Sequence, residues 1–203
     1  VSVAATKTFV AQVAAMYLLG LRIAELRGTL PPPLLRDLSA LVKDIEVDWN
    51  QFIGGKLSTQ TDTGVPKTRL VELANNILEV PADTTLQSRV AKIYDDRRKM
   101  AAGELPGDWG FAENLAYATL VEQNYNLRLV GQDVGRGTFF HRHAVLHDQK
   151  DGHTFMPLAT LRANASVEVI DSLLSEEAVM AFEYGHATTD PYTLHIWEGQ
   201  FGD

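Results

Sequence analysis

The sequence predicts an α/β protein, in which a helical N-terminal arm precedes a partial parallel-sheet domain. Two observations carry this prediction. In the first half of the chain, apolar residues recur at steps of three and four, which is typical of amphipathic helices. From Trp109 onward, helical segments alternate with short apolar segments of strand length. Such alternation indicates a parallel sheet with helices packed on it.

The N-terminal arm is predicted to be a helical hairpin over residues 1–45. Its first helix, over residues 8–27, is apolar around more than half of its circumference and stops before a glycine and a run of prolines. A second amphipathic helix follows over residues 33–45. Residues 46–68 hold three glycines, a proline and a polar run without either period, so we interpret them as a linker.

Linker and helices together make up residues 46–104. The apolar spacing predicts two helices here, over residues 68–78 and 84–102. The second helix carries the charged run DDRRK at residues 95–99. A run of charges on a helix is most simply a face exposed to water, and we expect that here.

Residues 105–203 are predicted to form the sheet domain. Its expected elements, in order, are a helix over 111–124, strands over 127–131 and 167–170, a helix over 176–188 and a strand over 193–197. About three strands make an incomplete sheet, and an unpaired sheet edge invites aggregation.

The composition limits the classes of function. The chain of 203 residues carries a formal net charge of −8, which opposes binding to a phosphate backbone or an anionic membrane. It has no cysteine, so a disulfide framework and a thiolate metal site are excluded. Its most apolar run is shorter than the roughly 20 residues that span a bilayer. We expect a cytoplasmic protein without anchor or signal peptide.

Three histidines, His141, His143 and His147, suggest a metal site at first sight. Alternate residues share one face of a strand, and residues four apart can share one face of a helix. Neither geometry brings all three side chains together unless the structure changes between them. We therefore expect hydrogen-bonded structural histidines and no metal site.

Three segments resemble a known family, in the order in which that family has them. They are GQDVGRGTFFHRHAVLH at residues 131–147, LLSEEAVMAFEYG at 173–185 and IWEGQFGD at 196–203. They are similar to the thiamine-diphosphate-dependent first component of 2-oxoglutarate dehydrogenase, and the resemblance covers residues 47–203. Gly199 stands where that family has an alanine.

This resemblance implies that residues 105–203 are part of a transketolase-like pyrimidine-binding domain. The parent reaction is the oxidative decarboxylation of 2-oxoglutarate in the tricarboxylic acid cycle, with transfer of the succinyl group to a lipoyl carrier. The implied cofactors are thiamine diphosphate and Mg, with the Mg ligands on a preceding domain absent from this chain. The implied partners are a lipoyl-bearing succinyltransferase and a second subunit of a homodimer, and the isolated chain is expected to be inactive.

The resemblance also selects two site residues. Glu176 matches the glutamate that hydrogen-bonds the aminopyrimidine ring of thiamine diphosphate, so it is predicted to be both catalytic and cofactor-binding. Gln200 matches a glutamine at the active site and is predicted to contact cofactor or substrate. The simpler alternatives are a first-turn acid that complements a helix dipole for Glu176 and a polar residue at a strand end for Gln200.

The opening segment VSVAATKTFVAQVAAMYLLGLRIAELRGTLPP resembles a different family. It is similar to the sugar-isomerase (SIS) domain of glutamine:fructose-6-phosphate amidotransferase, over about residues 1–45. The chain thus reads as an apparent chimera. Two alternatives remain open at this point, a phosphosugar isomerase fragment related to glucosamine-6-phosphate synthase and a noncatalytic chimeric interaction module.

Overall fold

The computed structural model describes residues 62–161 and 164–199. The predicted hairpin over residues 1–45, most of the linker and Gln200 lie outside the described residues. The chain divides into two compact units, one of residues 1–56 with 180–191 and the other of residues 57–179 with 192–203. The second unit holds the sheet and the residues of the candidate site described below. No helix of the described part of the chain is long and apolar enough to cross a membrane.

Three helices precede the sheet: α3 (Lys67–Ile77), α4 (Ser88–Ala102) and α5 (Trp109–Glu122). Local chemistry sets their ends. Gln87 caps α4, because its side-chain oxygen accepts hydrogen bonds from two backbone amides of the first turn, and Gly103 ends that helix with a φ of 81°. The carboxylate of Asp108 caps α5 by accepting from the amide of Phe111 at 2.7 Å. All three helices lie close to their predicted positions.

Helix α4 begins later than the predicted start at Thr84. The backbone there is used in another way, because the amide of Thr85 donates to a carboxylate oxygen of Asp148 at 2.6 Å and its carbonyl accepts from the amide of Gln149 at 2.9 Å. These bonds hold the segment extended against a distant loop, so the helix starts only at Ser88.

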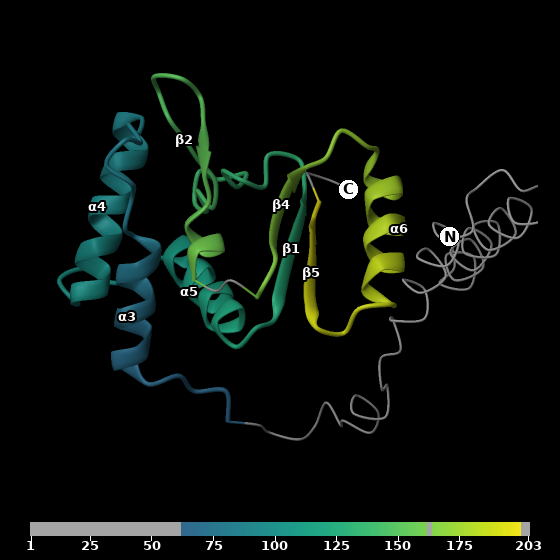
Figure 1. Ribbon diagram of the computed structural model, residues 1–203, viewed down its shortest axis with the longest axis horizontal. Helices are drawn as coiled ribbons and strands as arrows, with labels where there is room; N and C mark the ends of the chain where they lie inside the picture. The colour runs from purple at the N-terminus through teal and green to yellow at the C-terminus, as the bar shows by residue number, and fades with distance from the viewer. Residues whose placement is uncertain (1–61, 162–163, 200–203) are drawn as a thin grey trace, which may run out of the picture. The chain divides into compact units, whose positions relative to one another are not determined.

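The predicted parallel sheet is confirmed. Strands β1 (Asn126–Gly131), β4 (Val167–Asp171) and β5 (Thr193–Glu198) form a three-stranded sheet in the order β4-β1-β5 (Figure 1). Both strand pairs are parallel, with Val130 opposite Ile170 on one side and Trp197 on the other. Helix α6 (Glu176–Ala187) lies between β4 and β5 in the sequence.

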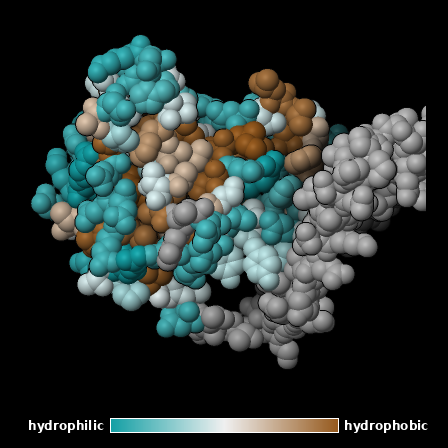
Figure 2. Space-filling view, in the orientation of Figure 1, coloured by the Kyte–Doolittle hydropathy of each residue, from teal (hydrophilic) through white to brown (hydrophobic). Residues whose placement is uncertain are grey.

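A small excursion between β1 and β4 has no counterpart in the sequence prediction. Two-residue strands β2 (Leu146–His147) and β3 (Thr154–Phe155) pair antiparallel, and a short 3₁₀ helix, η2 (Pro157–Thr160), follows. Figure 2 shows a hydrophilic surface over this hairpin and an apolar surface at the loop that joins β4 to α6, where Leu173 and Leu174 are exposed.

One core joins the helices to the sheet. Leu73 and Ile77 of α3 and Val121 of α5 are buried together with Leu127 of β1 and Leu158 of η2. Figure 1 shows α3, α4 and α5 gathered on one side of the sheet. This packing fixes the position of α5, whose polar residues reach the strand ends described below.

Arg97 corrects one prediction. The DDRRK run is not a uniformly solvated face, because Arg97 is only 2% exposed while its neighbours Asp95 and Arg98 are exposed. Its guanidinium donates to the carbonyl oxygens of His141 and Arg142 at 2.5 and 3.0 Å. A buried arginine needs such acceptors, and it finds them on a loop more than 40 residues away.

Candidate cofactor site

The candidate site lies at the carboxyl edge of the parallel sheet, where ligands bind in open α/β sheets. Strands β1, β4 and β5 end there at Gly131, Asp171 and Glu198. The amide of Ser172 donates to the carbonyl of Gly131 at 2.7 Å, which ties the two strand ends together. The loop after β1 is drawn to the same edge, since the amide of Gly135 donates to the carboxylate of Asp171 at 3.3 Å.

Glu176 is the first residue of α6 and follows the end of β4 by five positions. Its Oε2 accepts a hydrogen bond from the indole Nε1 of Trp197 at 2.9 Å. Its Oε1 is buried and has no hydrogen-bond partner among the described residues. The next residue, Glu177, is exposed. One carboxylate thus has an oxygen that is fixed and an oxygen that is available, which is an arrangement for binding a polar group.

A buried arginine organises the other half of this edge. Arg142 is 2% exposed, and its guanidinium donates to the Oε1 and Oε2 of Glu113 at 2.8 and 3.1 Å and to the carbonyl of Val134 at 2.9 Å. It also pairs with Glu198 at the end of β5. This bidentate contact with Glu113 is the geometry that a planar guanidinium suits best.

These ion pairs set the charge states of the cluster. Burial would lower the pKa of Arg142, but its hydrogen bonds to Glu198 and Glu113 outweigh burial and raise it. Burial would likewise raise the pKa of Glu113, but the hydrogen bonds from Arg142 and Tyr117 lower it. The Tyr117 hydroxyl donates to Glu113 at 2.7 Å. The cluster therefore holds a permanent cation between two carboxylates.

The loop that carries Arg142 is pinned to the helices by its backbone. Asn114 donates to the carbonyl of Arg142 at 3.1 Å, and the hydroxyl of Tyr94 donates to the carbonyl of His143 at 3.1 Å. Burial raises the pKa of Tyr94 to about 12, so it keeps its donor proton. Gly110 permits the close approach, because a Cβ there would lie 1.9 Å from the carbonyl oxygen of His141.

The three histidines of the sequence prediction do not form one group. His143 is buried, its Nε2 lies 3.1 Å from the carbonyl oxygen of Phe140, and burial lowers its pKa. His147 lies exposed on β2. His141 instead joins Glu113, with 3.6 Å between its Nε2 and a carboxylate oxygen. The contacts of His143 fit the structural role expected for the histidines, and for His141 and His147 that role stays a prediction.

Two other clusters have donor atoms spaced for a cation. One combines Glu113, His141 and Glu198, and the other combines Asp148, Asp151 and His153. In the first cluster, the Arg142 guanidinium already pairs with both carboxylates, and its charge opposes a metal ion. In the second, both carboxylates already accept hydrogen bonds from backbone amides, and the bonds from the amides of Thr85, Asp151 and Lys150 lower the pKa of Asp148 to about 2.

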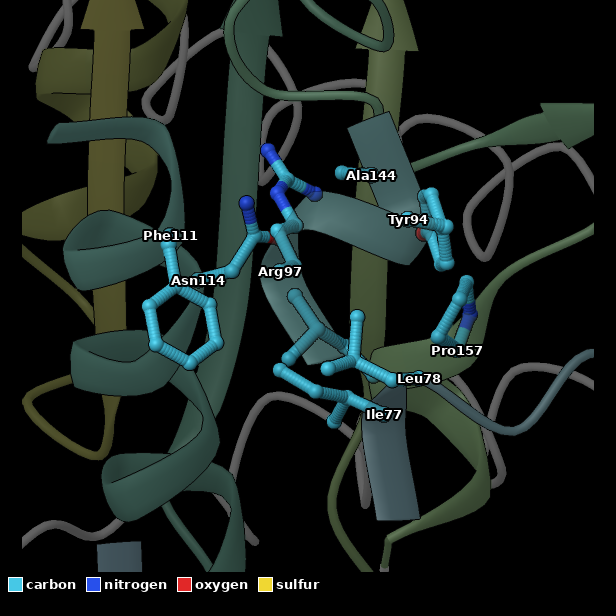
Figure 3. A pocket seen from close by; sticks show the side chains of 9 residues that line it. Ile77, Leu78, Tyr94, Arg97, Phe111, Asn114, Ala144 and Pro157 are labelled. Carbon is cyan, nitrogen blue, oxygen red and sulfur yellow. The ribbon is translucent and has the colours of Figure 1, made fainter. Parts of the chain in front are cut away.

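A small pocket lies within the core, where Arg97, Asn114 and Ala144 line it next to the loop that carries Arg142. Figure 3 shows its lining by Ile77 at the end of α3, by the next residue Leu78 and by Phe111 of α5, with Pro157 beside Leu78. Its interior is about 10 Å³, which suffices for one water molecule. It is too small for an organic cofactor, so the strand ends remain the candidate site.

Sequence reasoning selected Glu176, whose role stays a prediction, but missed its contact with Trp197 and the cluster around Arg142. The i, i+4 spacing of Glu113 and Tyr117 was the one local signal for that cluster. Trp197 and Glu176 are 21 positions apart, and nothing in the local pattern connects them. Gln200 lies outside the described residues, two positions beyond the end of β5.

Comparisons with known proteins agree with the fold. Residues 106–203 match the family described as transketolase, pyrimidine binding domain. The 2-oxoglutarate dehydrogenase E1 component of Haemophilus influenzae is 51% identical over 159 residues, which are 78% of this chain and 17% of that protein. The corresponding component of Azotobacter vinelandii is 47% identical over 171 residues, 82% of this chain and 18% of that protein.

The chain therefore spans about a sixth of the length of these relatives. The similarities support the interpretation of the chain as a fragment of a 2-oxoglutarate dehydrogenase E1 component, as the motifs predicted. They give no support to the phosphosugar isomerase alternative. The isomerase resemblance of residues 1–45 and the apparent chimera stay predictions.

Proposed function

We propose that this chain supplies the pyrimidine-binding half of a thiamine diphosphate site, with Glu176 as the acid-base group that hydrogen-bonds the aminopyrimidine. The parent reaction is the oxidative decarboxylation of 2-oxoglutarate, with succinyl transfer to a lipoyl carrier. The observation that carries the proposal is the buried Oε1 of Glu176, which has no partner in residues 62–161 and 164–199 and lies at the carboxyl edge of a parallel sheet.

The residues present fit this cofactor. An unpartnered carboxylate oxygen in a buried position gains a strong hydrogen bond when a ring nitrogen shares a proton with it, because the local dielectric is low. Trp197 occupies the other oxygen, so Glu176 offers one oxygen rather than two. The cofactor, when bound, supplies the nucleophilic carbon and the electron sink for decarboxylation. Glu176 holds and releases the proton at the pyrimidine.

The remaining parts of the site are proposed to come from elsewhere. Gln200 would contact the cofactor or the substrate from the segment after β5. Mg would be held by ligands of a preceding domain, and the second half of the site by another subunit of a homodimer. A lipoyl-bearing succinyltransferase would be the partner, in the cytoplasm. The isolated chain is then inactive, and measurable 2-oxoglutarate decarboxylation by this polypeptide alone would contradict the proposal.

The test uses the full-length subunit to which this segment belongs. We expect Glu176→Gln to reduce kcat for 2-oxoglutarate decarboxylation by at least about 100-fold, since an amide cannot exchange the proton. Glu177→Gln is the matched control, because Glu177 is the exposed neighbour on the same helix turn. Equal activity of the two variants would overturn the role of Glu176.

A further inference from the structure

We propose that Trp197 is a positioning residue for Glu176, whose indole N–H fixes one carboxylate oxygen and thereby directs the other toward the cofactor. This inference rests on the proposed function of Glu176. It concerns a residue that is proposed to act through Glu176.

The contact is a single directed hydrogen bond. Nε1 of Trp197 lies 2.9 Å from Oε2 of Glu176, and the two residues come from β5 and from the start of α6. Rotation about the last bond of a glutamate side chain is soft, with a broad distribution of angles. A donor on one oxygen restricts that rotation, so the position of the second oxygen becomes defined.

Tryptophan suits this role for two reasons. Its indole nitrogen is a donor only, so it cannot compete with Glu176 for a proton donated by a ligand. Its ring is rigid, so the donor position follows from the backbone and two side-chain torsions. A phenylalanine at this position would keep most of the apolar contact but leave Oε2 of Glu176 without its donor.

The strand beneath Trp197 is held from two sides. Trp197 pairs with Val130 of β1 in the parallel ladder, which fixes its backbone. The next residue, Glu198, pairs with the buried Arg142. Successive side chains of a strand point to opposite faces, so Glu198 meets Arg142 from one face of β5 and Trp197 meets Glu176 from the other. The position of the Glu176 carboxylate is therefore set by its contact with β5 as well as by its own helix.

The first experiment uses NMR to detect the hydrogen bond between Trp197 and Glu176 in the 203-residue chain without cofactor. The chain has three tryptophans, so ¹⁵N-tryptophan labelling gives three indole cross-peaks, and Trp197→Phe assigns the one of interest. We expect Glu176→Ala to move the indole peak of Trp197 and to speed exchange of its proton with solvent. Glu177→Ala and the peak of Trp109, which is 89% exposed, serve as controls.

An unmoved Trp197 peak in Glu176→Ala would overturn the positioning role. That outcome would leave the proposed function untouched, because no cofactor takes part in the measurement. The reverse also holds, since a loss of the catalytic role of Glu176 in the full-length subunit would not alter the indole spectrum.

The second experiment separates positioning from general stability, again in the full-length subunit. We expect Trp197→Phe to lower kcat about tenfold, as for loss of a hydrogen bond to a charged group, with KM for 2-oxoglutarate unchanged. Trp109→Phe is the control and should change neither value. A Trp197→Phe variant with unaltered kcat, or with its loss confined to KM, would contradict the proposal.

Discussion

Two carboxylate systems lie at the carboxyl edge of the same sheet, and they differ in how completely they are paired. Around Arg142, both carboxylates, Glu113 and Glu198, accept hydrogen bonds from one buried guanidinium. At Glu176, one oxygen is paired with Trp197 and the other has no partner among the described residues. The first system is closed, and the second is open on one side.

The difference separates a structural role from a functional one. A closed, buried ion pair has no capacity left for a ligand, and its removal is expected to disturb folding. An open, buried oxygen costs free energy until something binds it, and such groups call for an explanation. We therefore expect the Arg142 cluster to contribute to stability, and ligand binding by Glu176 stays a proposal.

The largest effect on stability is expected when Arg142 is removed from its pairs with Glu113 and Glu198. Arg142→Met keeps much of the side-chain volume but leaves two carboxylates without their cation, so the free energy of unfolding should fall by about 3–5 kcal/mol. Urea titrations followed by far-UV circular dichroism measure it. Arg142→Lys, which keeps the charge but loses the bidentate fork, should lose less. A loss under about 1 kcal/mol in Arg142→Met would show that the cluster is not structural.

A smaller effect on stability is expected from pH, through His143 in the loop that also carries Arg142. Burial lowers the pKa of His143 in the folded state, so the folded state binds fewer protons than the unfolded one below the ordinary histidine pKa of about 6.5. Stability should be full above that pH and decline as the pH falls through the folded pKa. His143→Asn tolerates the positive φ of 46° and should reduce the decline between pH 7 and 5.

The difference between the chain and His143→Asn, taken at each pH from urea midpoints, isolates this histidine. His153, whose pKa is raised by its hydrogen bond to Asp151, titrates with the opposite sign in both proteins and cancels. Identical pH slopes for the two proteins would contradict the buried, neutral state of His143.

We expect the smallest effect on stability from a substitution beside Trp197, the partner of Glu176. A Cβ at Gly199 would lie 3.4 Å from Cη2 and Cζ2 of Trp197, which is ordinary contact distance. Gly199→Ala should therefore support the indole and reduce the freedom of the unfolded chain, raising the free energy of unfolding by about 0.4–1 kcal/mol. Thermal unfolding measures the change. A destabilised variant would show that the indole has no room for a neighbour on that side.

The elements were predictable from the sequence wherever local periodicity determines them. The spacing of apolar residues placed α3, α5 and β1 within two residues of their observed bounds. It failed at Thr84, where a hydrogen bond from Thr85 to Asp148 competes with the helix, and at β2 and β3, which are too short to show a period. Long-range contacts decide these places, and no window of sequence contains them.

The site was predictable only in part, and for the same reason. Glu176 was selected through its motif, and the three histidines were expected to be structural. The burial of Arg97 in a run of charges was missed, because its acceptors are the distant carbonyls of His141 and Arg142. The contact between Trp197 and Glu176 was missed because it depends on how β5 and α6 meet in space.

The most direct test of the account is a double-mutant cycle on kcat in the full-length subunit, with Glu176→Gln, Trp197→Phe and the two combined. If Trp197 acts through Glu176, the double variant loses no more activity than Glu176→Gln alone, because residues that act as a unit are not additive. If the two losses in activation free energy add, Trp197 acts independently, and the assignment of one fixed and one available oxygen on Glu176 is wrong.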